Sequence, residues 1–84
     1  MKLLYFAWMR EKIGHAEENL DEIPAGAETV AGLMDYLQGR GGGYAEAFAD
    51  RKIVRIAVNQ SYADPTQQIA VGDEIAFFPP VTGG

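Results

Sequence analysis

Apolar side chains open the chain in a short, dense run. Residues Lys2 to Met9 carry them at both odd and even positions, which predicts a strand that needs cover on both of its faces. Residues 10–15 are mostly polar and contain a glycine, so we expect a hairpin turn there and a second strand at about residues 16–20. On this interpretation, His15 is a solvated residue at the tip of a loop.

The apolar period changes after Thr29, which is a good N-cap residue. The apolar side chains that follow have the i, i+3, i+4, i+7 spacing of a single helical face: Val30, Leu33, Met34 and Leu37. Gly39 suits the position that ends this helix. Residues 44–50 are expected to add a helical turn, with Tyr44 and Phe48 fixing the loop onto the core. The pattern therefore predicts one main helix.

The second half of the chain returns to the period of strands. Residues 52–59 alternate, with their buried side formed by Val54, Ile56 and Val58, as in a half-buried strand. Residues typical of turns follow at 59–61 and at 64–65. We expect a short strand near residues 67–70 and a last strand from Glu74 to Phe78.

The order strand, strand, helix, strand, short strand, strand indicates an α+β fold, a mixed sheet of about five strands clasping one main helix in the ubiquitin-like β-grasp arrangement. In that fold the first and last strands are parallel neighbours at the centre of the sheet. Alternation then assigns four side chains to the core that faces the helix: Leu3, Tyr5, Ile75 and Phe77. On the opposite face, an exposed interface cluster is expected from Phe6, Trp8 and Phe78. The alternative is that this parity is wrong and that these three side chains belong to the core.

Composition limits what the domain can do. A length of 84 residues fits one domain. The absence of cysteine excludes disulfides, thiolate metal sites and cysteine nucleophiles, and a single histidine is too few for a metal cluster. The net charge of −5 argues against nucleic-acid binding and favours a partner with a basic surface. No apolar run could span a membrane and no signal peptide begins the chain, so we expect a cytoplasmic protein.

The last six residues form a separate segment in this interpretation. Pro79 and Pro80 cannot extend a strand ladder, so we expect a β-grasp domain at residues 1–78 and an extended C-terminal tail at residues 79–84. Fully extended, this tail reaches roughly 20 Å, and its final Gly83-Gly84 carries no side chain that would block a narrow active site. An ordinary frayed terminus is the alternative. The absence of charged residues after Glu74 favours a tail that inserts into a partner.

Three segments resemble a known family: residues 3–14 (LLYFAWMREKIG), residues 58–60 (VNQ) and, above all, residues 72–84 (GDEIAFFPPVTGG). The chain is similar to the small subunit of molybdopterin synthase, a ubiquitin-like sulfur carrier of molybdenum cofactor biosynthesis. The resemblance implies that a ubiquitin-activating-type enzyme uses ATP to adenylate the carboxylate of Gly84, which is then converted to a thiocarboxylate. It also implies that the tail enters the large synthase subunit and donates sulfur to cyclic pyranopterin monophosphate. Two small and two large subunits would form the assembly, and the carrier itself would bind no cofactor and no metal.

Site residues follow from the same resemblance. Gly84 is the residue that reacts, as acyl-adenylate and then as thiocarboxylate, and contacts with partners are expected from Phe6, Arg10, Phe78, Pro80, Val81, Thr82 and Gly83. Phe6 and Phe78 match positions that pack against the large subunit. Arg10 matches a position suited to a salt bridge with a partner, although a solvated surface arginine is the alternative. The loop with three glycines at residues 41–43 is not required by the resemblance.

Other functions stay open at this point. The chain could be a sulfur carrier for thiamine or amino acid synthesis, a protein modifier joined to lysines through Gly84, or an interaction module without chemistry at its terminus. An independent catalyst is not favoured, because the sequence offers no histidine pair, no cysteine and no phosphate-binding loop. We therefore expect a subunit that donates sulfur without catalysing the transfer itself.

Overall fold

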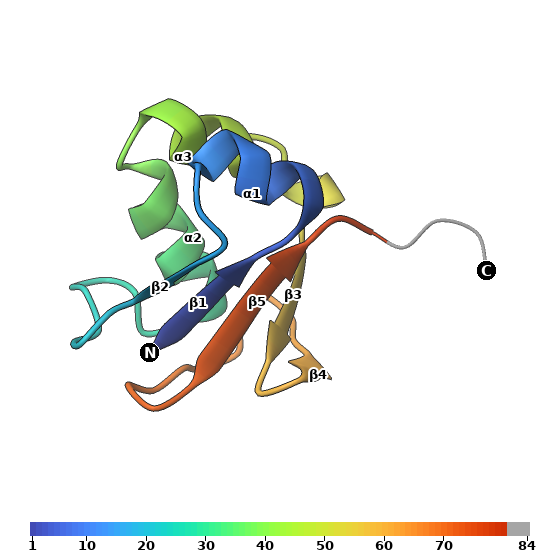
Figure 1. The fold of residues 1–84 in the computed structure, drawn as a ribbon. Coiled ribbons are helices and arrows are strands. Elements are labelled where there is room, and N and C mark those ends of the chain that lie inside the picture. Colours follow the sequence, from blue (N-terminus) through green and yellow to red (C-terminus); the bar gives the residue numbers. More distant parts are fainter. Residues whose placement is uncertain (81–84) are drawn as a thin grey trace.

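The computed structural model describes residues 1–80 and has one mixed sheet with helices packed against it (Figure 1). The elements in chain order are β1 (Lys2–Tyr5), α1 (Ala7–Ile13), β2 (Glu17–Asn19), α2 (Val30–Gln38), α3 (Gly42–Ala47), the 3₁₀-helix η1 (Arg51–Ile53), β3 (Arg55–Val58), β4 (Ser61–Tyr62) and β5 (Glu74–Phe78). The strands are arranged in the order β2-β1-β5-β3-β4. Because β1 and β5 are parallel and the other neighbouring pairs are antiparallel, the predicted β-grasp topology is confirmed.

The centre of the core lies where β1 and β5 face the helices. Leu3 and Tyr5 of β1 pair in register with Ile75 and Phe77 of β5, and all four side chains are at most 1% exposed. The parity predicted for these strands is therefore confirmed. The stacked rings of Tyr5 and Phe77 continue into Phe48, whose ring meets Phe77 edge-on. Each such large apolar side chain contributes about 2 kcal/mol when it leaves water.

Helix α2 forms as its sequence predicts. The hydroxyl oxygen of Thr29 accepts a hydrogen bond from the backbone N–H of Gly32, which satisfies one of the free donors of the first turn. The four residues of the predicted apolar face are all buried: Val30, Leu33, Met34 and Leu37. The helical turn expected after it is the short helix α3, which carries Tyr44, and Phe48 lies fully buried just past its end.

The first strand is shorter than predicted, because the chain enters α1 where the strand was expected to continue. Phe6 is still extended (φ −120°, ψ 155°), but Ala7 has a φ of 53°, and this left-handed residue turns the chain out of the sheet. The prediction of a strand to Met9 and a turn at residues 10–15 is therefore wrong. Gly14, with a φ of 97°, ends α1 and leads into β2, so the second strand was placed correctly.

The fourth strand also differs from the prediction. It lies at Ser61–Tyr62, not near residues 67–70, where Gln68 makes only an isolated bridge with Thr29. Asn59 (φ 51°) and Gln60 (φ 71°) form a two-residue turn that folds the chain back along β3. The Asn59 side chain also ties this turn to the start of β5, since its amide donates to Asp73 and its oxygen accepts from the N–H of Glu74.

Candidate functional site

The predicted site residues begin at the end of β5, the central strand that leads to the C-terminus (Figure 1). Phe78 is the last residue of this strand, and Pro79 and Pro80 follow it outside regular structure, as expected. The other tail residues lie outside the described part of the chain: Val81, Thr82, Gly83 and Gly84. Their roles, and the division into a domain at residues 1–78 and a tail at residues 79–84, stay predictions.

Phe6 and Phe78 lie next to each other on the outer face of the sheet. The N–H of Phe6 donates to the carbonyl of Phe77 at 3.1 Å, so the parallel register continues one step past the last pair, Tyr5 and Phe77. This step places Phe6 beside Phe78, on the face opposite the core. Phe6 is 46% exposed and Phe78 is half-buried, so both rings are available on that surface.

Trp8 does not join them. It belongs to α1 and packs, partly buried, against the core, so its expected place in an exposed aromatic cluster is wrong. Tyr62 of β4 takes that place, with its ring centroid 5.9 Å from that of Phe78 and 77% of its surface exposed. We call Phe6, Tyr62 and Phe78 the aromatic patch. Sequence reasoning missed Tyr62 because it placed turns at residues 59–61 and 64–65 and expected the short strand only near residues 67–70. The pair Asn59-Gln60, which suits a two-residue turn, was the signal for a strand at Tyr62.

Beside the aromatic patch, the surface is hollowed into a groove of about 630 Å³. Phe78, Pro80 and Tyr62 line it together with apolar side chains from α2 and from residues 54–56, including Met34, Val54 and Ile56. Pro80, predicted to contact a partner, thus lines this groove.

Arg10, the remaining predicted site residue within the described chain, is exposed on α1, and no ion pair to it is found within residues 1–80.

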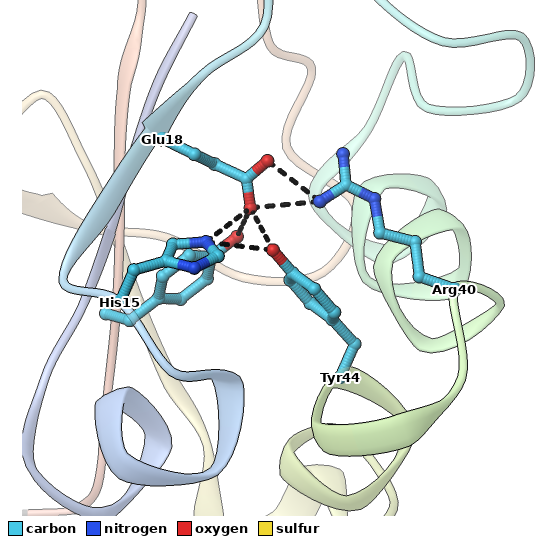
Figure 2. A network of polar contacts seen from close by, with 5 residues as sticks. His15, Glu18, Arg40 and Tyr44 are labelled. Carbon is cyan, nitrogen blue, oxygen red and sulfur yellow. Dashed lines mark hydrogen bonds and ion pairs between the residues drawn. The ribbon is translucent and has the colours of Figure 1, made fainter.

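A second concentration of polar side chains lies at the opposite edge of the sheet, around Glu18 of β2 (Figure 2). Its carboxylate accepts hydrogen bonds from the Tyr44 hydroxyl at 2.6 Å, from the Tyr5 hydroxyl at 2.7 Å and from Nη1 of Arg40 at 2.8 and 3.0 Å. His15 completes the cluster, with Nε2 lying 2.9 Å from the Tyr44 hydroxyl. We call these five residues the Glu18 cluster. His15 remains 42% exposed but has polar partners, so it is not the simply solvated loop residue that was expected.

The electrostatics of the Glu18 cluster are those of a structural contact. Burial alone raises the pKa of Glu18, but the hydrogen bonds from Tyr44, Arg40 and Tyr5 outweigh it and lower the pKa to about 2. Burial and the hydrogen bond to Glu18 raise the pKa of Tyr5 and of Tyr44. The carboxylate is thus ionised and its acceptor positions are filled by protein donors. The cluster therefore joins β1, β2 and the α2–α3 region instead of offering a reactive group.

Residues 1–80 contain no group of three His, Asp or Glu side chains placed to hold a metal ion. None of the described helices is long and apolar enough to cross a membrane.

Known proteins resemble this chain over its whole length. The model of the ThiS family matches residues 3–84. The molybdopterin synthase sulfur carrier subunit of Escherichia coli is 38% identical over 84 residues, and the subunit of the same name from Haemophilus influenzae is 39% identical over 84 residues. In both comparisons the match covers 100% of this chain and 99% of the other protein.

Solved structures of similar proteins have the same fold. A putative molybdopterin converting factor, subunit 1, from Pyrococcus furiosus has a TM-score of 0.74 at 34% identity, over 95% of each chain. SAMP1 from Haloferax volcanii has a TM-score of 0.69 at 28% identity and covers 100% of this chain and 98% of its own. The fold, the exposed aromatic patch at the end of β5 and these matches lead to one assignment. The chain belongs to the ThiS family and is a full-length homologue of molybdopterin synthase sulfur carrier subunits.

Proposed function

We propose that this chain is the sulfur carrier subunit of a molybdopterin synthase and that Gly84 carries the sulfur. The observation that supports this most strongly is the match to sulfur carrier subunits from end to end, at 38–39% identity in two bacteria. The aromatic patch supports it as well, because an exposed group of rings beside the strand that leads to the tail suits a protein interface. In this proposal the partner that admits the tail is the large synthase subunit, in an assembly of two small and two large subunits.

The chemistry starts from a poor electrophile. A C-terminal carboxylate is ionised at neutral pH and resists attack by sulfur. An activating enzyme of the ubiquitin type would join it to the AMP group of ATP and release pyrophosphate. A sulfur nucleophile would then displace AMP from the acyl-adenylate and leave a thiocarboxylate on Gly84. The carrier contributes no cysteine, since the chain contains none, so the sulfur must come from a separate donor.

Sulfur transfer would take place inside the large subunit. The thiocarboxylate sulfur would bond to cyclic pyranopterin monophosphate, and water would then cleave the bond between sulfur and the Gly84 acyl carbon, so that Gly84 returns to a carboxylate. Two such deliveries would supply both sulfurs of the dithiolene. The carrier would hold no cofactor itself, and the ATP would be bound by the activating enzyme. We place these reactions in the cytoplasm, where ATP is supplied. The aromatic patch would hold the carrier in place while the tail reaches the reacting atoms.

The decisive experiment uses the missing cysteine. The protein is isolated from its own cells, treated with a thiol-alkylating reagent and examined by intact and fragment mass spectrometry. We expect one adduct, located on Gly84, and none on a variant that lacks Gly84. Intact mass alone would not suffice, because exchange of oxygen for sulfur nearly equals one oxidation of Met1, Met9 or Met34 in mass. Absence of the adduct, even when activating enzyme, ATP and a sulfur donor are supplied, would contradict the proposal.

A second function has one observation in its favour. Two of the solved structures with the same fold are small archaeal modifier protein 1, at 27–28% identity. If this chain were a protein modifier, its activated carboxyl group would form an isopeptide bond with a lysine amine and release AMP. The same mass-spectrometry experiment separates the two functions, because a modifier would leave its C-terminal peptide on lysines of other proteins without an alkylated Gly84. After trypsin that peptide would be residues 56–84, since Arg55 is the last basic residue of the chain.

A further inference from the structure

The groove beside the aromatic patch exists because β4 is short. Its two residues, Ser61 and Tyr62, pair only with Ala57 and Val58, and one further hydrogen bond joins the N–H of Ala63 to the carbonyl of Ile56 at 3.0 Å. Beyond Ala63 the chain leaves β3, so Arg55 has no strand on that side, and the chain is held to the start of α2. The N–H of Ala31 donates to the carbonyl of Pro65 at 2.9 Å, and the N–H of Val30 donates to the carbonyl of Gln67 at 3.0 Å. A hollow of about 630 Å³ is left between these segments.

Most of the residues that line the groove are apolar, and one of its charged side chains has no partner within residues 1–80. Arg51 is already bound to Asp35 at 2.7 Å and to Gln38 at 2.8 Å. Asp64 is occupied as well, since it accepts from the N–H of Thr66 at 2.8 Å. Arg55 differs from both. It is exposed, and among residues 1–80 no ion pair or side-chain hydrogen bond involves it.

Arg55 also lies at the position where a partner must approach. It pairs with Phe78 across the β3–β5 ladder, so Phe6, Phe78 and Arg55 form one row on the outer face of the sheet. Pro80, the last described residue before the rest of the tail, lines the same groove. A protein that takes up the tail will therefore cover Phe78, the groove and Arg55 together. The groove is thus continuous with the proposed binding surface for the tail.

We propose that the large subunit of the synthase inserts an apolar side chain into this groove and places a carboxylate against Arg55. The inference rests on the proposed function and adds a second point of contact to it. It also differs from what the net charge of −5 suggests, because whole-molecule charge favours a basic partner, whereas the cation at this position favours a local acidic group. An ion pair at the edge of an apolar contact fixes orientation and excludes partners with a cation at that position.

The test compares charge reversal at two edges of the sheet. Binding of the full-length chain to the purified large subunit from the same organism is measured by calorimetry, with folding of each variant checked by thermal unfolding. We expect Arg55→Glu to weaken binding roughly 30-fold or more. Lys2→Glu makes the same change in net charge beside β2, where Lys2 pairs with Glu17, and should alter binding less than about threefold. One acidic residue of the large subunit, when replaced by lysine, should restore binding to Arg55→Glu.

A second pair of variants tests the apolar contact. Ala31→Phe fills the groove from α2 and should weaken binding roughly tenfold, whereas Ala45→Phe on α3, away from the groove, should leave it unchanged. If the wild type binds the large subunit and Arg55→Glu binds as tightly as Lys2→Glu, the inference about Arg55 is wrong, but the proposed function is unaffected. Absence of wild-type binding would overturn the proposed function as well. Self-association of the free chain that Ala31→Phe abolishes would instead assign the groove to a second copy.

Discussion

At the β2 edge of the sheet, the Glu18 carboxylate accepts hydrogen bonds from Tyr5, Arg40 and Tyr44, whereas at the β4 edge Tyr62 and Arg55 are exposed beside an open groove. The strand order puts these two edges on opposite sides of the central β1–β5 pair. At the first edge the charged side chains bind one another, whereas at the second edge Arg55 has no ion pair or side-chain hydrogen bond within residues 1–80. This difference indicates that stability and partner binding come from separate parts of a small domain, so substitutions should separate them.

A large loss of stability is expected at Gly43, beside the Glu18 cluster. A Cβ on this residue would fall on the backbone carbonyl of Lys12, so α1 and α3 could no longer pack at their present distance. We expect Gly43→Ala to lower the free energy of unfolding by about 3 kcal/mol or more, measured by urea denaturation. Gly39→Ala is the matched control, because its Cβ would meet only ordinary contacts at 3.4 Å. Equal stability of the two variants would show that the helices can separate at little cost.

A smaller loss of stability is expected when the carboxylate at the β2 edge is removed. Glu18→Gln keeps the shape of the side chain but replaces one acceptor by an amide donor, which faces the donors of Tyr44, Tyr5 or Arg40. We expect the free energy of unfolding to fall by about 2 kcal/mol, with binding to the large subunit unchanged. Glu17→Gln, next to it in β2, removes only an exposed pair with Lys2 and should cost less than about 0.5 kcal/mol. Weaker binding by Glu18→Gln would break the separation between the two edges.

A smaller effect is expected when acid is used in place of a substitution. Because its hydrogen bonds lower the pKa of Glu18 to about 2 against burial, its contribution is present above the unfolded pKa of 4.5 and is lost as the pH falls towards 2. Partial exposure screens this contribution, so it should be less than the pKa alone suggests. The difference in unfolding free energy between wild type and Glu18→Gln should stay constant at neutral pH and shrink below pH 4.5. If the difference in unfolding free energy between the two proteins stayed constant down to pH 2, the pKa of Glu18 would not be what controls it.

The smallest effect on stability is expected at the β4 edge. Phe78 is half-buried and contacts the ring of Tyr62, so Phe78→Ala should lower the free energy of unfolding by only about 1 kcal/mol. Binding to the large subunit should weaken roughly 30-fold, because rings at the centre of an interface carry most of its energy. The neighbouring Phe77 is fully buried, and Phe77→Ala should instead lower the unfolding free energy by about 4 kcal/mol. Comparable losses of stability in both variants would place Phe78 in the core.

The sequence predicted the parts of the fold that repeat a local period. Val30, Leu33, Met34 and Leu37 mark α2 by their spacing, and alternation assigned the core side chains of β1 and β5. Helix α1 was not predicted because it begins at the left-handed Ala7, with no capping side chain on Phe6. Nothing in a run of aromatic and aliphatic residues indicates such a turn. The position of β4 was lost in a similar way, since it depends on positive φ angles at Asn59 and Gln60.

The candidate site was predictable only where it is continuous with the last strand. Phe78 and Phe6 follow from parity and register, and the structure places them together. Tyr62, Arg55 and the groove depend on where β4 ends, which the local pattern does not specify. The Glu18 cluster could not be predicted at all, because its members come from distant segments that only tertiary packing brings together. The three glycines at residues 41–43 lie between Arg40 and Tyr44; Gly41 and Gly42 have positive φ angles, and a Cβ on Gly43 would meet the carbonyl of Lys12.

The central position of β5 has a consequence for the synthesis of the protein. Residues 2–5 leave the ribosome long before their parallel partners, residues 74–77, so the middle of the sheet stays empty until β5 has been made. A nascent chain without β5 lacks the fully buried Ile75 and Phe77 and leaves both β1 and β3 without their common neighbour. Prematurely terminated chains that stop before Glu74 should therefore remain unfolded and be removed by cellular proteases. In this way translation errors would produce few folded competitors that occupy the large subunit without a terminus to deliver.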